Sequence, residues 1–122
     1  GAYSRLTGNG INMPSSSYAV RYANASSAPP EAPAISNYDV SLATFKGTES
    51  TANTVVNIKD TNHSWLTVAK EPVLVQNNDW TLVADTIPHA GDIVLALAYQ
   101  LQNGSLGVTS DYSSPPFVVP SS

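Results

Sequence analysis

The residues of this chain best suited to chemistry are its two histidines. His63 lies in Asn62-His63-Ser64-Trp65, and His89 follows Pro88. A histidine can act as the base of a Ser-His-Asp site, but the Gly-x-Ser-x-Gly turn that exposes a nucleophilic serine is missing here. Both histidines also stand beside turn residues, where water surrounds them. We therefore expect no enzyme activity and no catalytic residues.

A metal centre is not expected from the sequence either. The chain has no cysteine, and two remote histidines do not provide the three protein ligands that a zinc site needs. Asp79, Asp85, Asp92 and Asp111 lie in or near predicted loops, but no run of alternating acidic residues concentrates their oxygens for calcium. We interpret them as solvated loop carboxylates and expect neither a metal nor another cofactor.

Binding is the chemistry that the remaining residues favour. Trp65 stands at a loop edge among polar side chains, so its ring could stack on a sugar while neighbouring amides bond the sugar hydroxyls. The alternative is that Trp65 is a core residue that faces Trp80 across two sheets. Tyr112 in the Ser-rich loop is the second candidate for a ligand contact. The alternative is that Tyr112 is only an exposed turn residue. The predicted ligand-binding residues are Trp65, Asn62, His63, Tyr112 and Asp111.

Length and charge limit the classes of partner. A chain of 122 residues forms about one domain and is long enough to bury one core. Only 11% of its residues are charged, with nine acidic against five basic ones. This balance argues against nucleic acid and against an anionic membrane surface. Since no apolar run approaches the roughly 20 residues that span a bilayer, we expect no membrane insertion.

Short apolar runs separated by polar turn residues follow one another from residue 34 onward. This spacing is typical of an all-β sandwich of antiparallel strands, and no window shows helical periodicity. Asn103-Gly104 predicts a two-residue type I′ hairpin, because both residues tolerate positive φ. Gly47-Thr48 is read as part of a break between strands. Strands are predicted at residues 37–45, 54–59, 65–69, 72–76, 79–84, 93–102, 107–109 and 117–119.

Two strands within residues 78–102 are predicted to hold the core together. Trp80 begins the first of them and is expected to plug the core. In the second, the large residues alternate with smaller ones, so all of them share one face of the strand. We expect this large face to point into the core. Its members are Ile93, Leu95, Leu97, Tyr99 and Leu101.

Residues 1–33 differ in character and are interpreted as an extended N-terminal arm. Residues 24–33 form a linker rich in Pro and Ser, which favours extended backbone. Before this linker Tyr18, Val20 and Tyr22 alternate as in a strand. We expect this short strand to pair with a sheet edge, either in its own domain or in a neighbouring copy or module.

Several turn and core positions carry a family resemblance. They are Val56-Asn57-Ile58-Lys59-Asp60, Trp80-Thr81-Leu82, Gly91 before a long alternating strand, and Asn103-Gly104 ahead of Phe117-Val118-Val119. With these motifs residues 34–120 resemble the bacterial immunoglobulin-like (Ig-like) domains that are repeated in surface adhesins. The resemblance implies an Ig-like antiparallel β-sandwich over residues 34–122, preceded by the arm of residues 1–33.

The function implied by this resemblance is structural. We expect a non-catalytic extracellular module, located outside the cell or on its surface, that acts as a spacer, adhesion or assembly unit of a bacterial or phage surface protein. Its expected partners are other protein modules or copies of itself, and glycans. The alternative is a small glycan-binding lectin or carbohydrate-binding domain, which a glycan array would distinguish because a pure spacer gives no selective signal.

Overall fold

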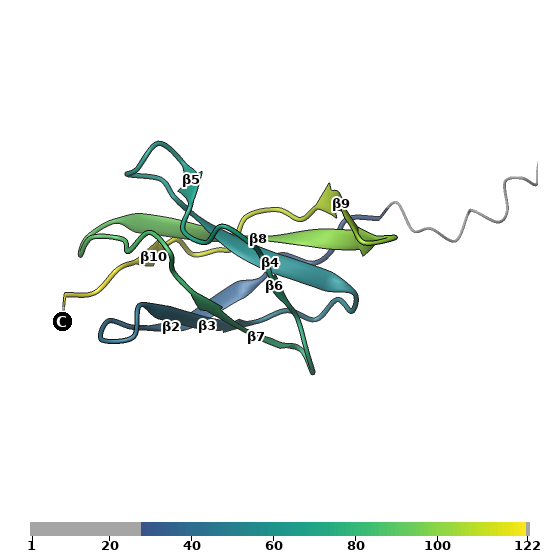
Figure 1. The fold of residues 1–122 in the computed structure, drawn as a ribbon, viewed down its shortest axis with the longest axis horizontal. Helices are drawn as coiled ribbons and strands as arrows, with labels where there is room; N and C mark the ends of the chain where they lie inside the picture. The colour runs from purple at the N-terminus through teal and green to yellow at the C-terminus, as the bar shows by residue number, and fades with distance from the viewer. Residues whose placement is uncertain (1–27, 122) are drawn as a thin grey trace, which may run out of the picture.

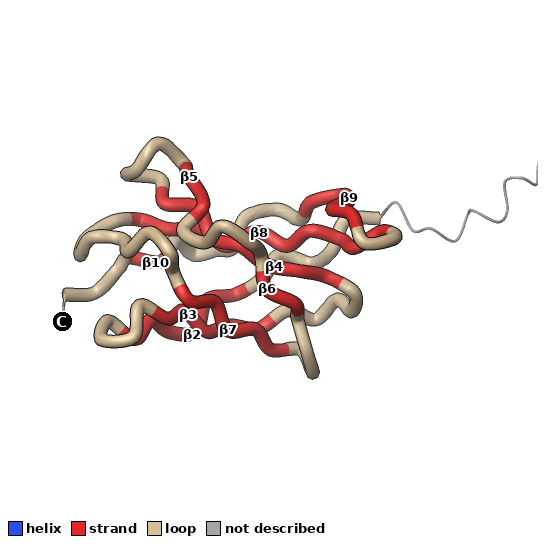
Figure 2. Tube along the Cα trace, in the orientation of Figure 1, coloured by secondary structure: helices blue, strands red, loops and turns tan. Residues whose placement is uncertain are grey.

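The computed structural model describes residues 28–121. Every described segment is strand, turn or loop, and none is helical (Figure 2). The strands form two antiparallel sheets that face each other as layers (Figure 1). The predicted all-β sandwich is thereby confirmed. The predicted arm strand with Tyr18, Val20 and Tyr22 lies outside the described residues.

The smaller sheet has three strands in the order β2-β3-β7, and the larger sheet has six. In the larger sheet β8 and β4 are the central pair; β10 and β9 join the far edge of β8, whereas β5 and β6 join the far edge of β4. The strands are β2 (Ala34–Asp39), β3 (Thr44–Thr48), β4 (Thr54–Asp60), β5 (Leu66–Thr67), β6 (Val73–Leu74), β7 (Asp79–Val83), β8 (Ile93–Gln102), β9 (Ser105–Thr109) and β10 (Phe117–Val118).

The first hairpin corrects the predicted single strand at residues 37–45. The chain turns between β2 and β3, because the Asp39 carboxylate accepts hydrogen bonds from the Ser41 hydroxyl (2.8 Å) and the Leu42 amide (3.2 Å). Aspartate often closes turns in this way. The expected break at Gly47-Thr48 is also wrong, since both residues belong to β3. The predicted hairpin at Asn103-Gly104 is confirmed, with φ of 53° and 82°.

The inward face of β8 is opposite to the predicted one. Val94, Ala96 and Ala98 are fully buried and belong to the core cluster, whereas Ile93 is 40% exposed. The physical reason is the size of the side chains across the sandwich. The facing sheet supplies the large rings, so the small face of β8 leaves room for them. The large residues of β8 therefore lie on the outer face of the larger sheet.

Aromatic rings fill the space between the sheets. Tyr38 and Phe45 are register partners whose ring centroids are 4.3 Å apart, and Phe45 meets Phe117 of the opposite sheet edge-on at 6.1 Å. Trp80 is 2% exposed, which confirms it as a core residue. Its indole nitrogen donates a hydrogen bond to the Thr48 carbonyl (3.0 Å), so the polar atom of the ring is satisfied.

Two serines extend the hydrogen bonding along β8 between β9 and β10. The Ser110 hydroxyl accepts from the Ala98 amide (2.9 Å), and the Ser113 hydroxyl accepts from the Ala96 amide (2.8 Å). The backbone amides of the two serines donate in return to the carbonyls of the same alanines. Because buried backbone groups need partners, these side chains hold an irregular segment against the sheet. That segment carries Tyr112.

Candidate functional site

The β8 strand places large apolar residues on the outer face of the larger sheet. Its residues include Leu95, Leu97 and Tyr99, opposite Lys59, Asn57 and Val55 of β4 in register. Leu97 is only 7% exposed although it lies on this outer face. Two aromatic residues, one from the β4 side of this sheet and one from the β8 side, contact each other.

Trp65 comes from the β4 side, in the loop between β4 and β5. This loop and β5 stand away from the layer on the side opposite the smaller sheet (Figure 1). The Asp60 carbonyl accepts the amides of both His63 and Trp65, each at 3.0 Å. Ser64 and Trp65 both have φ of 55°, a conformation that is costly for a bulky residue. The ring held in this way is 46% exposed, so the interpretation of Trp65 as a core residue is wrong.

Tyr112 comes from the β8 side, on the segment fixed by Ser110 and Ser113. It is 40% exposed, and its ring centroid lies 5.6 Å from that of Trp65, with the ring planes at 59°. Tyr99 of β8 adds a third ring. It lies on the same outer face of the sheet, and its pKa is raised mainly by burial and to a lesser degree by Tyr112. We call Trp65, Tyr112 and Tyr99 the aromatic platform.

The other predicted ligand-binding residues take different positions. The Asn62 side-chain oxygen accepts the Ile93 amide (2.7 Å), and the Thr61 hydroxyl donates to the Ile93 carbonyl (2.7 Å). Asn62 thus fastens the Trp65 loop to β8. Asp111 is exposed beside Tyr112. The structure therefore brings Trp65 and Tyr112 together and gives Asn62 a role in supporting them.

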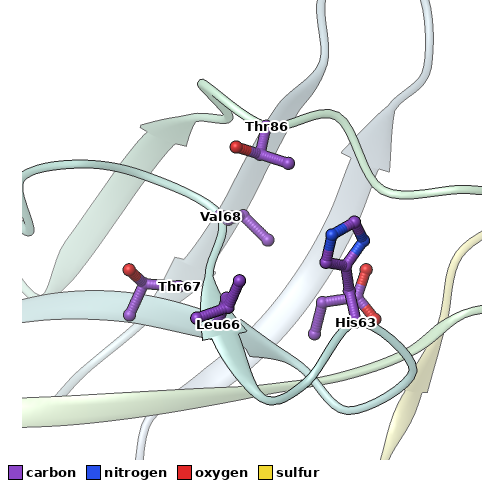
Figure 3. A pocket seen from close by; sticks show the side chains of 6 residues that line it. His63, Leu66, Thr67, Val68 and Thr86 are labelled. Atoms are coloured by element: carbon purple, nitrogen blue, oxygen red, sulfur yellow. The ribbon is translucent and has the colours of Figure 1, made fainter.

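His63 points to a separate cavity of about 120 Å³ (Figure 3). Trp65 is not among the residues that line this cavity. The cavity is too small for a drug-sized ligand, which needs about 300 Å³ or more. Its lining residues are Asp60, His63, Leu66, Thr67, Val68 and Thr86.

A pair of carboxyl groups lies at the base of the Trp65 loop. Asp60 is 4% exposed, and its pKa is raised by burial and by a hydrogen bond with the Asp92 carboxyl. That same hydrogen bond lowers the pKa of Asp92. The two shifts have opposite directions, so Asp60 holds its proton more tightly than Asp92 does. The sequence carries no signal for this contact, because Asp60 ends β4 and Asp92 lies in the turn before β8, far apart along the chain.

Other loop carboxylates predicted to be solvated serve as hydrogen-bond acceptors. Asp85 accepts the Lys70 amide (2.6 Å), and Asp92 accepts the His89 amide (3.1 Å). Within residues 28–121 no group of three or more His, Cys, Asp or Glu side chains is placed to hold a metal ion. No helix of the described part of the chain is long and apolar enough to cross a membrane.

Comparison with known proteins gives a likeness in structure and none in sequence families. No family model matches the sequence, and no curated protein does. A solved structure described as "Biofilm associated protein - BSP domain" matches with a TM-score of 0.50 and 19% sequence identity. The match covers 75% of this chain and 14% of that chain. At this identity the likeness shows a shared β-sandwich fold, and this chain spans about one seventh of the matched chain's length.

Proposed function

We propose that this chain is a non-catalytic extracellular module of a bacterial or phage surface protein, an Ig-like domain that works as a spacer or adhesion unit. The proposal rests on the positions of the two ends of the described chain. The described chain begins at one end of the long axis, near the tip of the β8–β9 hairpin, and ends at the other, beyond β10 (Figure 1). Modules joined through such ends extend a chain in one direction.

The likeness to a biofilm-associated protein supports the same proposal. The matched domain fold is a small part of a much longer chain, which is how a spacer is used. Only 11% of the residues are charged, so the surface has no strong potential that would attract a highly charged macromolecule.

A tandem chain of two copies tests the spacer role. We expect its maximum dimension in small-angle X-ray scattering to be close to twice that of one copy. A second tandem chain, in which residues 24–33 between the copies are replaced by a Gly-Ser linker of equal length, serves as the control for linker stiffness. Two copies that fold back side by side in the native tandem chain would contradict the proposal.

Assembly with other modules or copies of itself is part of the same proposal. β7 pairs with β3 on one side, and beside it lies a groove of about 260 Å³ lined by Leu74, Gln76, Asp79, Trp80 and Thr81. β2 likewise pairs with β3 alone among the described strands. Sheet edges of this kind accept an added strand through main-chain hydrogen bonds, and the Tyr18-Val20-Tyr22 strand is the donor that we propose.

A further inference from the structure

We propose that the aromatic platform of Trp65, Tyr112 and Tyr99 is a binding site for a neutral glycan, with Trp65 and Tyr112 stacking on pyranose rings. This site is independent of the spacer role, because it lies on the outer sheet face and not at either end of the chain.

The first argument is that the rings of Trp65 and Tyr112 stay exposed although three other large rings of the described residues are buried. Phe45, Trp80 and Tyr38 are 0%, 2% and 7% exposed, whereas Trp65 and Tyr112 are 46% and 40% exposed. Exposing a tryptophan forgoes the stabilisation that its burial brings. Trp65 adds the cost of a positive φ. Folding alone gives no reason for this arrangement, and a ligand does.

The second argument is preorganisation. The Asp60 carbonyl holds the Trp65 amide, Asn62 ties the loop to Ile93, and the Ser110 and Ser113 hydroxyls fix the segment on either side of Tyr112. Both rings are thus positioned before a ligand arrives, so little entropy is lost on binding. With their planes at 59°, the two rings offer differently inclined faces to a chain of sugars.

The third argument concerns the chemical class of the ligand. The C–H groups on one face of a pyranose ring carry partial positive charge and suit the negative face of an aromatic ring. Hydroxyl groups flank the platform, since Thr109 pairs with Tyr99 and Thr67 pairs with Lys59 of the same outer face. Asp111 lies next to Tyr112, Lys59 is a positive charge on the same outer face, and the net charge of the chain is −4. An acidic sugar is therefore disfavoured and a neutral one fits.

A protein partner fits the platform less well. A stable protein interface buries about 800 Å² on each side around a fully apolar centre. The platform offers two exposed rings, with Tyr99 already partly covered and with the exposed residues Thr67 and Thr109 on the same outer face. A surface of this kind suits a narrow chain of sugars.

The direct test is a fluorescence titration of the full chain. Trp65 is exposed and Trp80 is buried, so a sugar on the platform should change the emission of Trp65 and leave that of Trp80 as an internal reference. The probes are soluble neutral β-glucan, galactan and mannan, with alginate as the acidic comparison. We expect a saturable change with at least one neutral polymer and none with alginate.

Variants then assign the binding to the platform. In affinity electrophoresis, the gel contains the polymer that the native chain binds. Trp65→Ala and Tyr112→Ala should each weaken the affinity for this polymer about tenfold or more, as expected for a residue central to binding. Val83→Ala is the matched control, since Val83 is 60% exposed but lies on β7 of the other sheet. Trp65→Phe keeps a stacking ring and should retain part of the binding, which separates loss of the ring from loss of the loop.

Several results would overturn the proposal. One is no binding to any neutral polymer, and another is binding that Trp65→Ala and Tyr112→Ala leave unchanged. A third is a concentration-dependent dimer in light scattering that Trp65→Ala dissociates, because the platform would then be covered by a second copy. The spacer proposal is unaffected by each of them, since it is judged by the dimensions of the tandem chain.

Discussion

Trp80 lies directly across Gly47 of the neighbouring strand. The two residues are register partners in β7 and β3. A Cβ at position 47 would meet the Cζ2 and Cε2 atoms of the Trp80 ring and the carbonyl oxygen of Ala34. Gly47 is therefore required by close approach and not by its own backbone conformation. The missing side chain is what admits the largest ring of the core.

Replacing Gly47 by alanine should destabilise the fold. The added Cβ has both a ring and a backbone oxygen in its way, so the ring or the strand must shift. We expect a loss of about 3 kcal/mol, at the upper end of what overpacking typically costs, measured as a lower midpoint in urea unfolding. Thr81→Ala, an exposed change on β7, is the control. A Gly47→Ala midpoint equal to that of the control would show that the ring moves freely.

Removing the ring should be costly by itself and should relieve Gly47. Trp80→Ala is expected to lower the free energy of unfolding by about 3 to 5 kcal/mol, as for other buried large aromatic residues. In that background the ring no longer obstructs position 47, and Gly47→Ala should cost clearly less than it does alone. Additive losses in this double-mutant cycle would mean that the Ala34 carbonyl, and not Trp80, is the obstacle.

Glu49 makes stability depend on pH. It is 2% exposed, its Oε1 atom has no hydrogen-bond partner, and burial is the main cause that raises its pKa above the ordinary 4.5. A raised pKa in the folded state contributes stability below pH 4.5 that is lost as the pH rises through the folded pKa. Glu49→Gln stays neutral, so its melting temperature at pH 7 should exceed that of the native chain. At pH 4 the two should converge; a constant difference at both values would exclude titration of Glu49 as the cause.

Asp60 and Asp92 should give a second, separate pH effect. The raised pKa of Asp60 contributes stability at low pH that is lost as the pH rises through it, whereas the lowered pKa of Asp92 contributes stability above pH 3.8 that is lost as the pH falls. Asp60→Asn keeps a donor toward Asp92 at every pH. We expect this variant to melt higher than the native chain at pH 8. A lower melting temperature there would contradict a raised pKa of Asp60.

Deleting residues 1–27 tests strand addition and keeps the buried Pro30 and Pro33 and the hydrogen bond from the Glu31 amide to the Thr51 hydroxyl (2.9 Å). If the Tyr18-Val20-Tyr22 strand pairs with a sheet edge of its own domain, the shortened chain should melt at a lower temperature. If it pairs with a neighbouring copy, light scattering of the full chain should show concentration-dependent assembly that the deletion abolishes. A shortened chain that matches the full chain in both measurements would make the arm a passive tether.

The sequence by itself determined the fold class and much of the strand pattern. The alternation of β8, the hairpin at Asn103-Gly104 and the burial of Trp80 were all predicted and are confirmed. These features are local, because period-two alternation and turn residues with positive φ act within a few residues of the chain. The prediction of one strand at 37–45 was wrong because it missed the turn that Asp39 closes. A single aspartate is too weak a local signal for a turn.

Only the tertiary structure decided which face of β8 is the core and where the aromatic platform lies. Period-two alternation predicts that the two faces of β8 differ in side-chain size. Which face points inward depends on the side chains of the opposite sheet, and these include the large rings of Phe45 and Trp80. The contact of Trp65 with Tyr112 likewise joins residues far apart in sequence. Such contacts arise when two loops meet over a sheet. The spacing of residues along the chain does not predict the distance between the two rings.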